Sequence, residues 1–196
     1  TPSGTLGILT MASNGDYTFA PYQTNYSGPV PVITYTLASS TGETATATLT
    51  LTVTPVSDAP GVTRDAANVT TPEDTAIALG FNAPTVSDAT DQNGAGVTGD
   101  NPERLSLISL TDIPSGAILQ DALGNTLYTI PASGSATVTI SLSDATNLIA
   151  SPGAAILTMT TAQFEALKVL PPADLGTNFT ARMTVTEYEV DASGNQ

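Results

Sequence analysis

The chain has 196 residues, 40% of them hydrophobic, which suits one or two folded domains and argues against wholesale disorder. Eighteen acidic residues against four basic ones give a net charge of −14, and such a surface repels the phosphates of nucleic acids and anionic lipids. Histidine and cysteine are both absent, which excludes Ser–His and Cys–His nucleophiles, ordinary zinc sites and disulfides, and leaves Ca²⁺ or Mg²⁺ as the metals that oxygen ligands would hold.

Alternation of β-branched and small apolar residues is the dominant pattern of the chain. The run 44–54 alternates Thr with Ala, Leu and Val, which predicts a half-buried strand. Comparable runs predict strands at 30–38, 75–81, 105–110, 126–130, 136–142, 154–159 and 179–190. Clusters of Gly, Asn, Asp and Ser separate them. Many short strands joined by such turns predict an all-β fold of antiparallel β-sandwich modules.

One helical segment is predicted late in the chain. Thr160 to Gln163 fit a capping box, and Phe164, Leu167 and Leu170 then recur on one helical face. The prolines at 171 and 172 are expected to end this helix.

Two parts of the chain share a pattern, which predicts two modules. A Leu-Thr-Met triplet at 9–11, a turn with proline, a strand and a Gly-containing hairpin recur from 157–159 onward. We expect residues 1–57 to be the C-terminal strands of one module and residues 58–196 to be a second, larger module that lacks its last strand. Incomplete modules leave sheet edges without partners, so we also expect strand exchange between neighbouring copies.

Several motifs resemble the repeats of very large bacterial surface adhesins. The resemblance rests on Gly4-Thr5-Leu6, on 14–21 and on 25–28, while the run 45–60 is similar to the end of such a repeat and of a cadherin domain. Pro72-Glu73-Asp74-Thr75 and 157–172 resemble the long repeat of RTX-type adhesins, which are type I secretion targets with VCBS-like domains. The resemblance covers nearly the whole chain.

This resemblance implies immunoglobulin-like or cadherin-like modules in tandem, exported through a type I secretion system to the bacterial cell surface. It also implies a role in cell adhesion and biofilm formation, with repeats that Ca²⁺ stiffens and that project a binding domain. The partners would be neighbouring modules of the same chain. The Gly-rich nonapeptide repeats of RTX proteins are missing, so that calcium-binding fold is not expected.

The order of strands predicts where acidic side chains gather. If the second module is an up-and-down sandwich with its first strands near 62–70, 75–81 and 105–110, the linker, the loop after the second strand and the closing hairpin share the pole that faces the preceding module. The turn at 73–74 lies at the opposite pole. Calcium takes about 6–8 oxygen ligands, and a junction between modules can gather them. The candidate calcium ligands are Asp58, Glu73, Asp74, Asp88, Asp91 and Asp191.

The same residue types have a plainer interpretation. Asp, Asn and Gly populate turns because they accept unusual dihedral angles and bond to backbone groups, with or without a metal. Asp16, Asp112 and Asp121 are predicted to be turn residues of this kind.

The function expected from these features is that of a non-enzymatic extender in an adhesin. The alternative is a module of the same adhesin that binds a glycan or a peptide. Such sites commonly present aromatic platforms, whereas Trp is absent and Tyr17, Tyr22, Tyr26 and Tyr35 fall in predicted strands or turns. A glycosidase would need two carboxylates that face each other across a groove, and the acids here are predicted at module ends.

Overall fold

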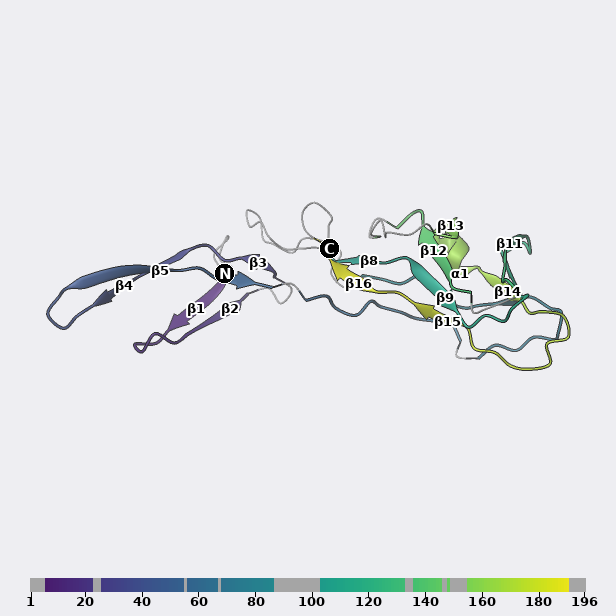
Figure 1. Ribbon diagram of the computed structural model, residues 1–196, viewed down its shortest axis with the longest axis horizontal. Coiled ribbons are helices and arrows are strands. Elements are labelled where there is room, and N and C mark those ends of the chain that lie inside the picture. Colours follow the sequence, from purple (N-terminus) through teal and green to yellow (C-terminus); the bar gives the residue numbers. More distant parts are fainter. Residues whose placement is uncertain are drawn as a thin grey trace. The chain divides into compact units, whose positions relative to one another are not determined.

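The computed structural model describes residues 6–22, 26–54, 56–66, 68–86, 103–132, 136–145, 148 and 155–190. These residues form many strands and one short helix (Figure 1), which confirms the predicted all-β fold. Two compact units divide the chain, the first containing Thr1–Ser57 and the second containing Asp58–Ser87 and Arg104–Tyr188. The assignment of these two units as consecutive modules stays a prediction.

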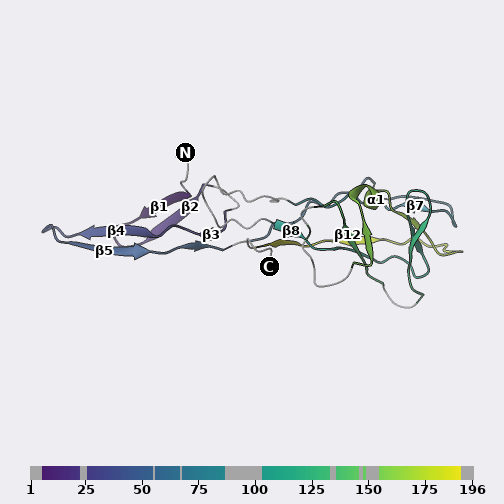
Figure 2. The same ribbon diagram turned by 90° about the horizontal axis from the view of Figure 1, so that it is seen from above.

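The first unit consists of two-stranded antiparallel sheets. β1 (Gly7–Met11) pairs with β2 (Tyr17–Pro21), β3 (Gly28–Pro29) pairs with β6 (Thr52–Val53), and β4 (Ile33–Ala38) pairs with β5 (Thr44–Leu49). Figure 2 shows β4 and β5 running side by side as a long hairpin. Gly15 and Gly42 provide the positive φ angles, 94° and 88°, that the turns of the β1–β2 and β4–β5 hairpins need.

The predicted strand 44–54 differs from the observed structure. It is divided into β5 and β6, and the half-burial expected for it is wrong for β5, in which only Leu49 is partly covered. The alternating pattern correctly predicts an extended strand, but burial depends on a second layer, which the pattern does not supply.

The second unit contains two four-stranded sheets. Their strand orders are β11-β10-β14-β7 and β13-β12-β9-β15. A separate ladder pairs β8 with β16 at the point where the chain passes from one unit to the other. The bounds are β7 Ile77–Ala78, β8 Glu103–Leu105, β9 Ile108–Thr111, β10 Ile118–Gln120, β11 Thr126–Thr129, β12 Val138–Leu142, β13 Leu157–Met159, β14 Lys168–Leu170, β15 Arg182–Thr184 and β16 Glu187–Glu189. Pairing within the four-stranded sheets is antiparallel except between β12 and β13, which are parallel.

One aliphatic core lies between these two sheets. Every second residue of β12 is buried, as the predicted alternation requires. Buried side chains from both sheets belong to one cluster, so the unit is a sandwich. The cluster includes Ile108, Leu110, Leu119, Val138, Ile140 and Val169, with Phe164 and Leu167 from the segment around the helix.

The helix α1 (Thr161–Glu165) begins as predicted but ends earlier. Its N-cap Thr160 accepts a hydrogen bond from the Gln163 backbone N–H (3.2 Å), and Gln163 Oε1 accepts one from the Thr160 backbone N–H (2.8 Å), which confirms the capping box. The extension of the helix to residue 170 is wrong, because Lys168–Leu170 form β14, which pairs with both β10 and β7. The prolines that follow therefore end a strand.

The strands on which the placement of the acids was based are shorter than predicted. Among the described residues of 62–70 there is one isolated bridge, Arg64 to Phe81, and a second bridge joins Gly61 to Thr85 just before the segment. Backbone hydrogen bonds also join Asp65 to Gly80 (2.9 Å) and Asn82 to Thr63 (3.1 Å). The run 75–81 contains only the short β7, and 105–110 is divided between β8 and β9. The described residues of 62–70 therefore do not form the regular first strand assumed for an up-and-down sandwich.

Candidate functional site

The predicted calcium ligands are only partly within the described chain. Asp58, Glu73 and Asp74 are described and exposed, whereas Asp88, Asp91 and Asp191 lie outside the described residues. Within the part of the chain that the structure describes, no three acidic side chains come together in a way that could hold a metal ion. The three described acids therefore do not form a calcium site by themselves.

The turn that carries Glu73 and Asp74 is held by threonine hydroxyls. Thr75 Oγ1 donates to the Glu73 carbonyl (3.3 Å), and Thr71 Oγ1 donates to the Thr75 carbonyl (3.3 Å). Asp74 has a φ of 58°, a left-handed conformation that Asp adopts more readily than most residues. The backbone geometry of this turn is thus sufficient reason for an aspartate at position 74.

Asp121 organises the turn between β10 and β11. Its Oδ1 accepts hydrogen bonds from the backbone N–H groups of Leu123 (2.9 Å) and Asn125 (2.8 Å), and its Oδ2 accepts one from the Asn125 side-chain amide (2.7 Å). These bonds, the side chain of Asn125 first, lower the pKa of Asp121. The prediction that Asp121 is a turn residue is confirmed.

Asp144 joins the end of β12 to the start of the helix. One oxygen, Oδ1, accepts hydrogen bonds from both the backbone N–H (2.7 Å) and the hydroxyl (3.0 Å) of Thr161. The backbone bond from Thr161 is the main cause that lowers the pKa of Asp144. Sequence reasoning missed this residue, because its partner is 17 positions away and no local motif marks the pair.

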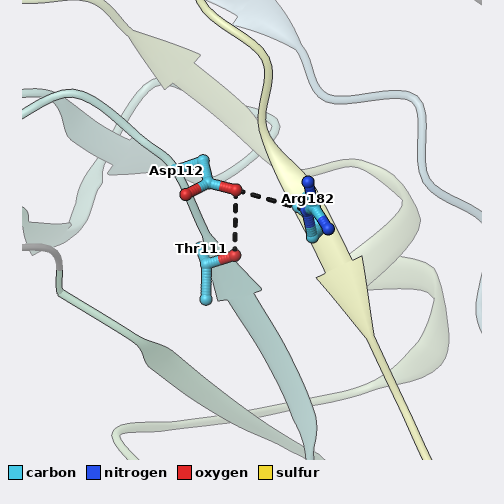
Figure 3. A network of polar contacts seen from close by, with 3 residues as sticks. All are labelled: Thr111, Asp112 and Arg182. Carbon is cyan, nitrogen blue, oxygen red and sulfur yellow. Dashed lines mark hydrogen bonds and ion pairs between the residues drawn. The ribbon is translucent and has the colours of Figure 1, made fainter.

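Asp112 and Arg182 form an ion pair between the end of β9 and β15 (Figure 3). The Arg182 Nε to Asp112 Oδ2 distance is 3.3 Å, and the side chains are 71% and 52% exposed. Thr111 Oγ1 also donates to Asp112 Oδ2 (3.4 Å). Because both charged groups are well solvated, the pair contributes little to stability.

Two glutamates occupy buried positions. Glu103 in β8 is 2% exposed and Glu187 in β16 is 4% exposed. Both make polar or electrostatic interactions, as expected of acids, which are almost never fully buried unless paired or bound to a metal. In β16 the acids alternate with Tyr188, so either the acids or the tyrosine had to face inward, and at Glu187 the acid does.

No helix in the described ranges is long and apolar enough to cross a membrane. Comparison of the chain with protein-family models, with curated proteins and with solved structures finds no match in any of the three.

Proposed function

We propose that this chain is a non-enzymatic extender of a bacterial cell-surface adhesin, exported through a type I secretion system, with Ca²⁺ stiffening the junctions between its modules. It would serve adhesion and biofilm formation by holding a binding domain away from the cell. The proposal is supported by the resemblance of its motifs, by the all-β fold with a packed sandwich, and by the excess of acidic residues.

The excess of acidic over basic residues is the observation that carries the calcium part of the proposal. Carboxylates that gather in one place repel one another unless a positive charge lies between them. The chain has 18 acidic residues and only 4 basic ones, so its own cations are too few to serve most of its carboxylates. A hard divalent cation supplies that charge, and oxygen ligands are the only kind this chain offers in number.

The proposed ligands remain the six acids at the predicted module ends, Asp58, Glu73, Asp74, Asp88, Asp91 and Asp191. Asp58, Glu73 and Asp74 would need further oxygen donors, since they do not come together among the described residues. When bound, the ion would neutralise acids that otherwise repel one another, and folded conformations that gather them would become more stable.

A thermal unfolding experiment tests this proposal. The full chain is melted in excess EDTA, in excess Ca²⁺ and in excess Mg²⁺, and we expect Ca²⁺ to raise the Tm by several degrees, as expected for a ligand that binds only the folded state. Glu73→Gln, which keeps the shape of the side chain of a proposed ligand but removes its charge, should reduce the Ca²⁺-dependent shift. The matched control is Glu43→Gln in the exposed turn before β5, which should leave the shift unchanged. Equal Tm values in EDTA and Ca²⁺ would refute the calcium part.

The alternative, a glycan-binding or peptide-binding module, has less support. Tyr17 and Tyr22 are 47% and 44% exposed. They lie five positions apart on one extended ladder, since Tyr22 N–H bonds to the Leu6 carbonyl beyond β2 (2.9 Å). An odd spacing along a strand directs side chains to opposite faces, so the two rings do not form one platform.

A further inference from the structure

The β4–β5 hairpin has one polar face and one apolar face. Its register pairs Ile33 with Leu49, and successive pairs alternate faces from there to Ala38 and Thr44. The polar face carries threonines, and Thr36 Oγ1 lies 3.4 Å from Thr46 Oγ1 across the strands. The apolar face carries Ile33, Tyr35, Leu37, Ala45, Ala47 and Leu49.

The half of the apolar face nearest the turn is uncovered. Leu37 is 60% exposed, and Ala45 and Ala47 are exposed beside it. Among the described residues, β4 and β5 have no strand neighbour other than each other. Because an isolated two-stranded sheet is marginally stable in water, this hairpin gains stability from any further strand or layer that joins it.

The register also shows which backbone groups of β5 are open to a new strand. Ser39 N–H bonds to the Glu43 carbonyl (2.8 Å) at the base of the turn. Hydrogen-bonded and non-hydrogen-bonded pairs alternate in an antiparallel ladder, so the pairs at Thr44, Thr46 and Thr48 are non-hydrogen-bonded. The close Thr36–Thr46 side chains agree with this phase. The N–H and C=O groups of these three threonines therefore point away from β4.

The two edges of the hairpin differ in the residues that border them. On the side of β4, Pro29 in β3 and Pro31 precede the strand, and they lack the N–H with which a new strand could extend its pairing beyond β4. On the side of β5 and β6 the run 44–54 contains neither proline nor a charged residue. Natural edge strands are commonly protected by charge, proline or bulges, and this edge has none of them.

The distribution of charged residues indicates which partner can pair with the open edge of β5. From residue 17 to residue 57 the only charged side chain is Glu43, while the remaining 17 of the 18 acids lie elsewhere in the chain. Two copies of so acidic a protein repel each other over most of their surface, but not along this edge. A basic partner, in contrast, would be drawn to the acidic regions. The segment that carries β5 is thus the one on which a second copy meets the least repulsion.

We propose that β5 pairs antiparallel with β5 of a second copy of this chain, so that two hairpins form one four-stranded sheet. A two-fold axis passes near Thr46, as an isologous contact between identical strands requires. The outward groups of the threonines at 44, 46 and 48 bond across this axis, and the apolar faces of the two hairpins become continuous. This association does not depend on calcium.

The test is the mass of the full chain in solution, measured by light scattering and sedimentation over a concentration series in EDTA. We expect a species of 39.6 kDa, twice the 19.8 kDa of one chain, to appear as the concentration rises. Thr46→Pro removes an outward N–H and should abolish the dimer. The matched control Thr36→Pro changes the directly opposite residue on the other edge and should leave the dimer intact.

A second pair of variants tests the same edge without proline, in case the proline variants do not fold. Thr46→Lys keeps the backbone N–H but places like charges across the two-fold axis, so it should also prevent dimerisation, whereas Thr36→Lys should not. Circular dichroism and the Tm confirm that each variant is folded. A wild-type chain that stays monomeric at every concentration would overturn the proposal, and so would a dimer that survives both changes at Thr46. Because every measurement is made in EDTA, failure here is independent of failure of the calcium proposal.

Discussion

Ile140 lies in the middle of the sandwich core of the second unit. It is 0% exposed and pairs in register with Ile108 of β9, which is equally buried. Truncating Ile140 to alanine removes apolar contact and leaves a cavity that close-packed neighbours refill only in part.

We therefore expect Ile140→Ala to lower the free energy of unfolding by about 2–5 kcal/mol, measured by urea denaturation. The control Leu123→Ala changes a side chain that is 88% exposed in the β10–β11 turn, and it should change stability by less than about 0.5 kcal/mol. Similar losses for the two variants would contradict the placement of the core.

Asp144 supports a prediction about pH. Hydrogen bonds from Thr161 lower its pKa from the ordinary value of 3.8, so the charged form is favoured in the folded state. The contribution to stability is thus present above the unfolded pKa and is lost as the pH falls through the lower, folded pKa.

Asp144→Ala should therefore lower the Tm at neutral pH, and the difference from the wild type should shrink as the pH drops below about 4. Melting curves over a pH series measure this. The control is Asp65→Ala, an exposed aspartate whose side chain accepts no hydrogen bond from the described residues. A Tm difference for Asp144→Ala that is constant down to the lowest pH would contradict the role of the charge.

At the residue scale, the role of a side chain can be predicted from the sequence when its hydrogen-bond partners are close to it in the chain. Asp121 bonds to groups two and four positions away, and its turn pattern made it recognisable. Asp144 bonds to a residue 17 positions away, and the inward direction of Glu187 depends on how β16 is covered. Neither can be derived from local composition.

The capping box at the start of α1 allows a prediction about the free energy of unfolding. Thr160→Ala removes the hydroxyl that accepts the Gln163 N–H and should lower the free energy of unfolding by about 1 kcal/mol, measured by chemical denaturation. Thr160→Ser, which keeps the hydroxyl, is the control and should stay close to the wild type. Equal losses in the two variants would mean that the hydroxyl does not act as a cap.

At the element scale, helix α1 shows which features a local sequence pattern can predict and which it cannot. The start of α1 was predictable because the capping box lies within four residues. Its end was not, because Lys168–Leu170 gain two strand neighbours, β10 and β7, and tertiary pairing outweighs the helical spacing of Phe164, Leu167 and Leu170. The proline pair correctly predicted an end but not the kind of element that ends there.

At the scale of the whole molecule, the all-β fold was predictable, whereas the grouping of acids stays a prediction, because Asp88, Asp91 and Asp191 lie outside the described residues. Alternation and turn clusters recur along the chain and together specify strands. The placement of acids at poles, in contrast, assumed an unbroken first strand at 62–70, where the described residues form one isolated bridge, Arg64 to Phe81, and no regular strand. A change in one strand alters which turns share an end, so the pole assigned to Asp58 and the opposite pole assigned to Glu73 and Asp74 cannot be derived from strand order alone.

Isothermal titration calorimetry of Ca²⁺ into the full, chelator-treated chain tests the central proposal most directly. We predict saturable heats with a defined stoichiometry that disappear in excess EDTA, together with weaker or no heats when Mg²⁺ replaces Ca²⁺, since calcium accepts the larger and more irregular oxygen shells that loops provide. Heats no larger than those of dilution, at protein and ion concentrations that span the millimolar range expected of weak extracellular sites, would contradict a calcium-stiffened extender.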